Sequence, residues 1–232
     1  KKILISEGRY VPTVTTLHGT DITLVGKDKS ISSVVSFSLN KSDGVTAVSN
    51  SLREDTYKLF NVEKEIEVIH NFIDLDRFTK KNKDHFKKAI APNGEKIIIH
   101  TSNFRQVKRV DDVIKTFARI YEKIPSTLLL IGDGPERRSL EELCRTIGLC
   151  DQIRFLGKQD AIQEVLALGD LFILPSANES FGLAALEAMA CEVPVISTDI
   201  GGLPEVNKNN TTGYICALGD IDDMAEKAIH IL

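Results

Sequence analysis

The sequence predicts an α/β fold built on parallel sheets that are doubly wound by helices. From residue 96 onward, short apolar runs rich in branched residues alternate with segments whose apolar residues recur at helical spacing. Such alternation is typical of a parallel sheet with helices on both faces. The five runs that we interpret as strands are residues 96–100, 127–131, 153–156, 171–174 and 193–197.

The helices between these strands follow from the spacing of their apolar residues. The first of them carries Val110, Val113, Ile114, Phe117, Ile120 and Tyr121. The second carries Leu140, Leu143 and Ile147. A further helix follows the strand at 171–174. It stops near Pro194, because a helix interior does not accept proline.

Residues 1–70 show the same alternation incompletely. Runs at 11–17, 44–48 and 67–69 are interpreted as strands, and Ser49 is an N-cap for the helix after the second run. Three strands with an abrupt start indicate the back half of a second doubly wound domain. The predicted organisation is therefore residues 1–75 as the C-terminal part of a first domain, 76–92 as a solvated or helical linker, and 93–232 as a second domain.

Composition limits the partners that the chain can bind. Its 42% hydrophobic and 27% charged residues are ordinary for a globular protein, and the net charge of −4 argues against a general nucleic-acid or anionic-membrane surface. No apolar run approaches the roughly 20 residues of a membrane span. The four cysteines lack paired metal-ligand spacing, which favours reduced thiols in a cytoplasmic enzyme. We expect no nucleic-acid partner and no integral membrane segment; a homo-oligomer stays open.

Polar or glycine-containing segments follow the predicted strands of the second domain directly. They are residues 100–102, 132–134, 157–158, 176–179 and 199–202. Ligands of doubly wound sheets bind beyond the carboxyl ends of the strands, where these segments meet. The sequence therefore predicts one site at this rim.

Two acids at this rim, Glu179 and Glu187, are placed to hold two parts of one bound molecule. Glu179 precedes the last predicted helix, where free backbone N–H groups and the helix dipole favour an anionic ligand. Glu187 lies on the helix with apolar neighbours three and four positions away, and a buried carboxylate is costly unless it is hydrogen-bonded. The alternative is a local salt bridge for Glu187 and a solvated loop for Glu179.

The spacing of these acids resembles the Glu-x7-Glu motif of retaining, nucleotide-sugar-dependent glycosyltransferases of family 4. Further landmarks of that family are similar and in the same order: residues 71–78, the region of Lys108, 132–135 and 201–205. Residues 17–23 and 100–109 resemble the branch that joins N-acetylglucosamine to L-malate in the bacillithiol pathway. The resemblance implies a GT-B type fold of two doubly wound domains, the first incomplete in this chain and the second without its closing helices.

The resemblance also implies the reaction. A retaining enzyme would transfer N-acetylglucosamine from UDP-N-acetylglucosamine to a small hydroxy acid, with no cofactor and no obligatory metal. Fixed cations would stabilise the departing diphosphate, a role that falls to Lys108 and Arg105. The family usually has Gly-Arg about five residues before the lysine, where this sequence has Ser102-Asn103, so Arg109 is the alternative to Arg105.

The same resemblance assigns the donor contacts. Glu187 would accept hydrogen bonds from ribose hydroxyls, and Glu179 would contact the donor sugar. Backbone N–H groups around Phe181, Gly182 and Leu183 would hold sugar and phosphate oxygens, while Gly157 and Lys158 would meet the uracil edge. Gly132 and Gly134 would let the chain pass close to the nucleotide, although a plain turn explains them equally well.

The acceptor side is assigned from fewer residues. His18 ends a predicted strand of the first domain and would hydrogen-bond the donor sugar without acting as a base. L-Malate is a dicarboxylate, so its pocket should present cations and hydroxyls, and we expect Thr16, Thr20 and Arg53 to contribute.

Several alternatives to this interpretation differ from it in the substrates or in the activity. The protein could be another family 4 glycosyltransferase that uses a different sugar nucleotide, or a lipid or polysaccharide acceptor. It could also be a noncatalytic protein that binds a nucleotide sugar without transferring the sugar. A dinucleotide-binding oxidoreductase is disfavoured because Gly132-x-Gly134 is followed by Arg137 where a third glycine should stand. A phosphorylase or epimerase is disfavoured by the acid pair.

Overall fold

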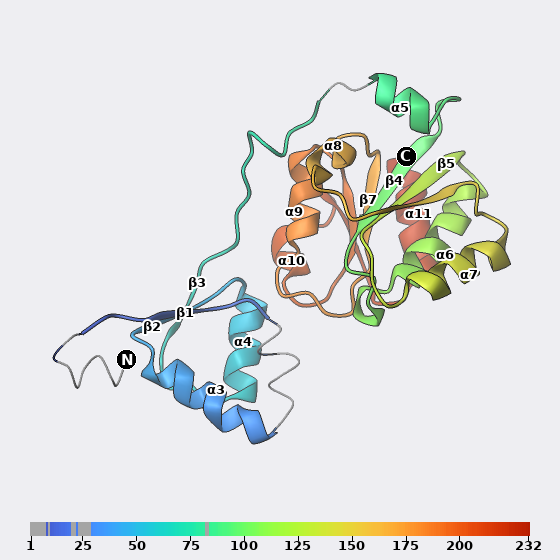
Figure 1. Ribbon diagram of the computed structural model, residues 1–232. Helices are drawn as coiled ribbons and strands as arrows, with labels where there is room; N and C mark the ends of the chain where they lie inside the picture. Colours follow the sequence, from blue (N-terminus) through green and yellow to red (C-terminus); the bar gives the residue numbers. More distant parts are fainter. Residues whose placement is uncertain (1–7, 9, 20–21, 23–28, 82–83) are drawn as a thin grey trace. The chain divides into compact units, whose positions relative to one another are not determined.

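The computed structural model describes residues 8, 10–19, 22, 29–81 and 84–232, which form two compact units (Figure 1). The first unit comprises Lys1–Asn71 with Glu179–Phe181, and the second comprises Phe72–Asn178 with Gly182–Leu232. Each unit contains a parallel sheet, as the sequence predicted. The domain bounds of 1–75, 76–92 and 93–232 stay a prediction.

The sheet of the first unit has the strand order β1-β2-β3 within the described residues. Its elements are β1 (Val14–Leu17), α3 (Lys29–Lys41), β2 (Gly44–Ala47), α4 (Asn50–Leu59) and β3 (Ile66–Val68). Ser49 caps α4 as predicted, since its side chain accepts a hydrogen bond from the Leu52 N–H at 3.1 Å. Strand β1 begins later than expected: Pro12 has no N–H, and the Thr13 N–H donates to the Asp43 carboxylate at 2.8 Å.

The second unit alternates strands and helices along most of its length. Its strands are β4 (Lys96–Thr101), β5 (Ser126–Ile131), β6 (Ile153–Gly157), β7 (Leu171–Leu174), β8 (Val195–Thr198) and β9 (Gly213–Cys216). Its helices are α5 (Asp84–Ile90), the 3-10 helix η2 (Gln106–Lys108), α6 (Val110–Tyr121), α7 (Arg137–Ile147), α8 (Ile162–Leu166), α9 (Leu183–Ala190), α10 (Leu203–Val206) and α11 (Ile221–Ile231).

These six strands form one parallel sheet in the order β6-β5-β4-β7-β8-β9, with helices on both faces (Figure 1). Alternate residues of each strand face opposite cores, because side chains in a strand alternate with period two. Ile98 and Leu130 belong to the core under α6, α7 and α11, whereas Ile99 and Leu129 belong to the core under α9. The doubly wound sheet predicted from the sequence is confirmed.

The structure differs from the predicted elements in the start of one strand and in several unpredicted elements. Strand β8 begins at Val195 and not at Val193, because Pro194 has no N–H to enter the ladder. Strand β9, helices α3, α8, α10 and α11 and the 3-10 helix η2 were not predicted.

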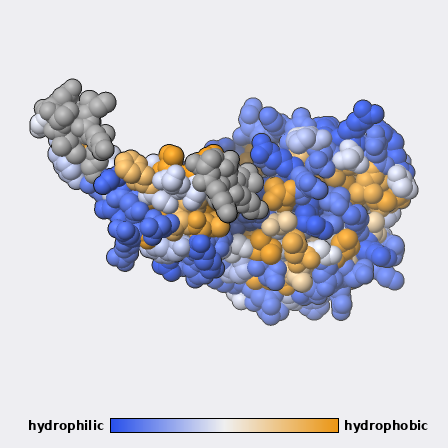
Figure 2. Space-filling view, turned by 90° about the horizontal axis from the view of Figure 1, so that it is seen from below, coloured by the Kyte–Doolittle hydropathy of each residue, from blue (hydrophilic) through white to orange (hydrophobic). Residues whose placement is uncertain are grey.

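Within the described part of the chain, no helix is both long enough and apolar enough to cross a membrane. On the face shown in Figure 2, hydrophilic residues dominate the surface and apolar residues form smaller patches.

Candidate functional site

The strand order of the second unit creates a topological switch point between β4 and β7. The chain proceeds from β4 to β5 on one side and from β7 to β8 on the other, so the connections after β4 and β7 leave in opposite directions. In doubly wound sheets, ligands bind in the crevice beyond the strand ends at this reversal. The loops after β4 and β7 are joined there, since the Ala177 N–H donates to the Val107 carbonyl at 2.8 Å.

The loop after β4 is anchored by Phe104, whose side chain is fully buried. Its ring meets the Phe155 ring edge-on, with centroids 6.3 Å apart. Its carbonyl accepts a hydrogen bond from the Glu136 N–H at 3.0 Å. Sequence analysis missed this anchor, because a single phenylalanine in a predicted loop carries no periodic signal.

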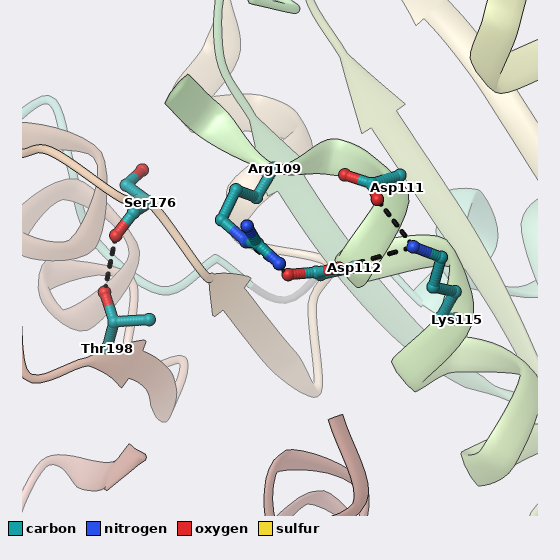
Figure 3. Close-up of polar contacts among 6 residues, drawn as sticks. All are labelled: Arg109, Asp111, Asp112, Lys115, Ser176 and Thr198. Carbon is teal, nitrogen blue, oxygen red and sulfur yellow. Dashed lines mark hydrogen bonds and ion pairs between the residues drawn. The ribbon is translucent and has the colours of Figure 1, made fainter. Parts of the chain in front are cut away.

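The three cations of this loop differ in their surroundings. Arg105 is exposed, and Lys108 is half-buried at the end of η2. Arg109 has a left-handed backbone with φ 49°, and its Nε donates to Oδ2 of Asp112, whose side chain is 1% exposed, at 2.5 Å. Lys115 Nζ lies 3.6 Å from the other carboxylate oxygen (Figure 3). Arg109, the alternative to Arg105 for the diphosphate, is therefore already paired with a buried carboxylate.

The glycines after β5 have a packing reason that needs no ligand. A Cβ on Gly132, where φ is +121°, would lie 1.9 Å from the Ser102 carbonyl oxygen. A Cβ on Gly134 would lie 2.6 Å from the carbonyl oxygen of Phe104. Both positions thus let the loop after β5 pass close to the loop after β4. Gly157, at the end of β6, has no atom within 4 Å of its Cβ position, and Lys158 beyond it is exposed.

Glu187 is half-buried on α9, the helix that follows the loop after β7. Burial raises the pKa of its carboxyl group, and the positive charge of Arg77 acts in the opposite direction. This agrees with the partly desolvated carboxylate that its apolar neighbours predicted. The helix begins after Gly182, whose backbone is left-handed with φ 101°, and its first residue, Leu183, is exposed.

Glu179, the other acid of the motif, belongs to the first unit together with Phe181. Glu179 is half-buried, and Phe181 is buried with its ring centroid 5.8 Å from that of His70. The two acids of the motif therefore fall in different units, Glu179 in the first and Glu187 in the second.

The acceptor-side residues lie in the first unit, apart from Thr20, which lies outside the described residues. His18 is exposed directly after β1. Thr16 is exposed on β1, and its hydroxyl accepts a hydrogen bond from that of Thr46 at 2.9 Å. Arg53 is half-buried on α4.

Within the described residues, no group of three or more His, Cys, Asp or Glu side chains is placed to hold a metal ion.

On the β7 side of the switch point, the Ser176 carbonyl accepts a hydrogen bond from the Thr198 hydroxyl at 2.7 Å, which ties the loop after β7 to β8 (Figure 3).

A fully buried histidine, which sequence analysis did not single out, lies where β4 and β7 separate. The two strands pair through Ile98–Leu171 and Ile99–Phe172. The next residue of β4, His100, forms a hydrogen bond with β7 through its side chain. Its Nδ1 lies 2.8 Å from the Ile173 carbonyl oxygen, and its Nε2 lies 2.8 Å from the Ser102 hydroxyl oxygen. Burial lowers the pKa of His100 to about 4, so the ring is neutral at pH 7.

The tautomer of His100 follows from these partners. A carbonyl oxygen only accepts, so Nδ1 carries the proton and donates to Ile173. Nε2 of the neutral ring then has only a lone pair, and the Ser102 hydroxyl donates to it.

We expect the buried His100 to make folding stability depend on pH. The unfolded histidine binds a proton below its ordinary pKa of 6.5, while the folded one does so only below about 4. Stability is therefore lost as pH falls through this window, by about 3 kcal/mol in all. Urea unfolding between pH 7 and pH 4 should show this loss in the native protein and not in His100→Gln. His85→Gln, at an exposed histidine, is the control and should keep the native pH dependence. Parallel pH profiles for all three proteins would contradict the expectation.

Comparison with known proteins agrees with this architecture. A sequence model of the family described as Glycosyl transferases group 1 matches residues 81–232, and one described as Glycosyltransferase Family 4 matches residues 3–77. The chain is 47% identical to N-acetyl-alpha-D-glucosaminyl L-malate synthase of Bacillus anthracis over 97% of its own length and 59% of that enzyme. It is 32% identical to D-inositol 3-phosphate glycosyltransferase of Mycolicibacterium smegmatis over 72% of its length and 40% of that enzyme. The chain thus spans little more than half of the first of these relatives.

Solved structures show the same fold. Anabaena HepE in complex with UDP and glucose matches 98% of this chain and 62% of its own, with a TM-score of 0.84 at 24% identity. TarM matches 95% of this chain and 43% of its own, with a TM-score of 0.80 at 22% identity. The predicted GT-B type fold is confirmed. With a family match over residues 81–232, the chain belongs to the glycosyl transferases of group 1.

Proposed function

We propose that the whole protein is a retaining glycosyltransferase that moves N-acetylglucosamine from UDP-N-acetylglucosamine to L-malate. The observation that supports this acceptor is the 47% identity to N-acetyl-alpha-D-glucosaminyl L-malate synthase of Bacillus anthracis over 97% of the chain. The D-inositol 3-phosphate glycosyltransferase of Mycolicibacterium smegmatis is only 32% identical. The much higher identity to the L-malate-linked enzyme favours L-malate as the acceptor.

The donor half of the proposal is supported by the switch point of the second unit. A nucleoside diphosphate sugar would lie beyond the carboxyl ends of β4 and β7, as ligands of such sheets do. Lys108 would stabilise the diphosphate as negative charge develops on it, with Arg105 as a second cation. The N-terminus of α9, opened by Gly182 and Leu183, would offer backbone N–H groups to sugar and phosphate oxygens. Gly157 and Lys158 would meet the uracil edge.

The acids would bind the sugars, since ionised carboxylates only accept hydrogen bonds and therefore suit hydroxyl ligands. Glu187 would take the ribose hydroxyls, and Glu179 the transferred sugar. His18 would hydrogen-bond that sugar, and Thr16, Thr20 and Arg53 would contribute to the acceptor pocket. We propose a cytoplasmic enzyme that needs no metal or other cofactor. Its four cysteines are free, as reduced thiols would be.

The test of the proposed function is an acceptor assay with the full-length protein. UDP-N-acetylglucosamine is supplied with L-malate, inositol phosphate or a glycan acceptor in parallel reactions, and UDP release is measured. We expect release that depends on L-malate and a product with the alpha anomer. Transfer to another acceptor and none to L-malate would overturn the acceptor. Replacing UDP-N-acetylglucosamine with UDP-glucose in the same assay tests which sugar the enzyme transfers.

We expect Glu187→Gln to weaken UDP binding by about 1–3 kcal/mol, the loss typical of a hydrogen bond to a charged group. The amide keeps the shape of the side chain and replaces one acceptor oxygen with a donor. Isothermal titration of the full-length protein with UDP measures the change. Glu192→Gln is the matched control, because Glu192 is an exposed acid just beyond the same helix, paired with Lys80 at 3.0 Å. Unchanged affinity in a folded Glu187→Gln protein would assign that acid to structure.

A further inference from the structure

Residues 179–181, which include the first acid of the motif, lie in the connection from β7 to α9 but belong to the first unit. Three residues of that unit come close to this segment, and each lies two residues beyond the end of a strand. They are Gly19 after β1, Ser49 after β2 and His70 after β3. Because the three strands are parallel neighbours, residues 179–181 lie along the carboxyl edge of the described sheet of this unit.

The contact with Ser49 is a hydrogen bond whose direction is fixed. The hydroxyl oxygen lies 2.6 Å from the Ser180 carbonyl oxygen, and a carbonyl only accepts, so the single hydroxyl hydrogen points to Ser180. The same hydroxyl oxygen accepts the Leu52 N–H at 3.1 Å as the N-cap of α4. Ser49 is fully buried. Its side chain is therefore held in one orientation by two partners, one in α4 and one in residues 179–181.

The contacts of Gly19 and His70 with the segment are made by packing. A Cβ on Gly19 would lie 2.6 Å from the Cβ of Ser180, so the chain after β1 passes Ser180 at a distance that a side chain would not permit. Phe181 is buried, and its ring centroid lies 5.8 Å from that of His70. Apolar packing is non-directional, whereas the hydrogen bond from Ser49 requires the Ser180 carbonyl to point at the hydroxyl. Ser49 thus fixes how the backbone of the segment is turned.

The acid that depends on this arrangement is Glu179, which directly precedes Ser180 and is half-buried. On the N-terminal side of the acid, the loop is held within the second unit, where the Ala177 N–H donates to the Val107 carbonyl at 2.8 Å. On the C-terminal side, the chain is held by Ser49. A carboxylate binds a sugar hydroxyl well only at an oxygen–oxygen distance of about 2.5–3.0 Å, so a small shift of this backbone weakens the contact.

We propose that Ser49 is a positioning residue for Glu179: its hydroxyl, oriented as the N-cap of α4, donates to the Ser180 carbonyl and holds the acid for the transferred sugar of a nucleoside diphosphate sugar. The serine would act on that sugar through the acid, without touching the sugar itself. The inference rests on the proposed contact between Glu179 and the transferred sugar.

The test compares UDP-N-acetylglucosamine with UDP, because UDP lacks the sugar that Glu179 would hold. Affinities of the full-length protein for both ligands are measured by titration calorimetry for Ser49→Gly, Glu179→Ala and the double variant. We expect Glu179→Ala to weaken UDP-N-acetylglucosamine about tenfold or more, the range of a hydrogen bond to a charged group, and Ser49→Gly to weaken it about fivefold. Each single change should alter UDP affinity less than about twofold, and in the Glu179→Ala background Ser49→Gly should add less than about twofold to the loss.

Substitutions at Ser49 separate the hydrogen bond to Ser180 from the capping of α4. Glycine caps helices nearly as well as serine, so Ser49→Gly removes the donor with little effect on the helix. Ser49→Asp keeps the cap as an ionised carboxylate with no hydrogen to donate, and gives the same comparison if the glycine variant does not fold. Ser49→Thr keeps both bonds at an extended backbone, φ −154° and ψ 159°, and should stay within about twofold of native affinity for both ligands. Ser139→Ala, at an exposed serine that donates to the Glu136 carbonyl, is the control.

The proposal fails if Ser49→Gly and Ser49→Asp keep the native affinity for UDP-N-acetylglucosamine, or if they weaken UDP to the same extent. It also fails if Ser49→Gly adds its full loss to that of Glu179→Ala. The outcome separates this inference from the proposed function. If Glu179→Ala leaves UDP-N-acetylglucosamine affinity unchanged or weakens both ligands alike, the sugar role of Glu179 fails, and the positioning role fails with it. If Glu179→Ala weakens UDP-N-acetylglucosamine alone while Ser49→Gly changes nothing, only the positioning role fails.

Discussion

Replacing Gly132 with alanine is expected to lower the free energy of unfolding of the second unit by about 3 kcal/mol or more, from a strained backbone and an overpacked contact together. The added Cβ would lie 1.9 Å from the Ser102 carbonyl oxygen at a φ of +121°, a conformation that residues other than glycine rarely adopt. Relief requires the loop after β5 to move away from the loop after β4. Urea unfolding measures the loss.

Gly157→Ala is the matched control for this substitution. Gly157 also ends a strand with a positive φ, +67°, but no atom lies within 4 Å of its Cβ position. Only the backbone cost of the left-handed conformation applies, about 1–2 kcal/mol. Equal destabilisation of the two variants would show that the close approach of Gly132 to Ser102 is not what requires glycine there.

Phe104→Ala should destabilise the second unit by about 3–5 kcal/mol, the range for removing a fully buried aromatic side chain. The loss includes the edge-on contact with Phe155, worth about 1 kcal/mol beyond burial alone. Because Phe104 anchors the loop that carries Lys108, we also expect weaker UDP binding in variant protein that is still folded. Urea unfolding and titration with UDP test the two parts.

Val107→Ala controls for apolar truncation in the same loop. Val107 is 38% exposed, so its replacement should change stability by about 0.5 kcal/mol or less. Phe104→Leu keeps most of the buried volume and should lose less than Phe104→Ala. A loss in Phe104→Ala no larger than in Val107→Ala would contradict the anchoring role.

Sequence analysis succeeded where a pattern is local. Strands β4 to β8 of the second unit were found because a strand buried on both faces is a continuous apolar run, as in residues 171–174. Helix α9 ends at Ala190, before Pro194, as the exclusion of proline from a helix interior predicted. Sequence analysis missed strand β9, because residues 213–216 form a short run that contains glycine, tyrosine and cysteine and is only partly buried. Helix α3 was missed because residues 29–41 are rich in serine, which favours helix caps and turns over helix interiors.

The candidate site also contains both residues whose positions follow from local sequence and residues whose roles depend on tertiary contacts. The positions of Lys108 and Glu187 at the rim were predicted, because they depend on which residues follow which strand. The roles of Gly132, His100 and Phe104 were not, because each depends on a contact with a segment distant in sequence or on complete burial. Arg109 illustrates the difference: the sequence shows one more cation beside Lys108, while the structure pairs it with Asp112.

By itself, the sequence determined the α/β class and the family and predicted the rim of the candidate site, because apolar periodicity, proline and glycine positions and motif spacing are properties of neighbouring residues. Only the tertiary structure decided the strand order that places β4 beside β7, and with it the topological switch point. It also decided that His100 is buried, neutral and in one tautomer, because desolvation and hydrogen-bond partners come from packing against β7. Chain segments that meet only after folding set these features.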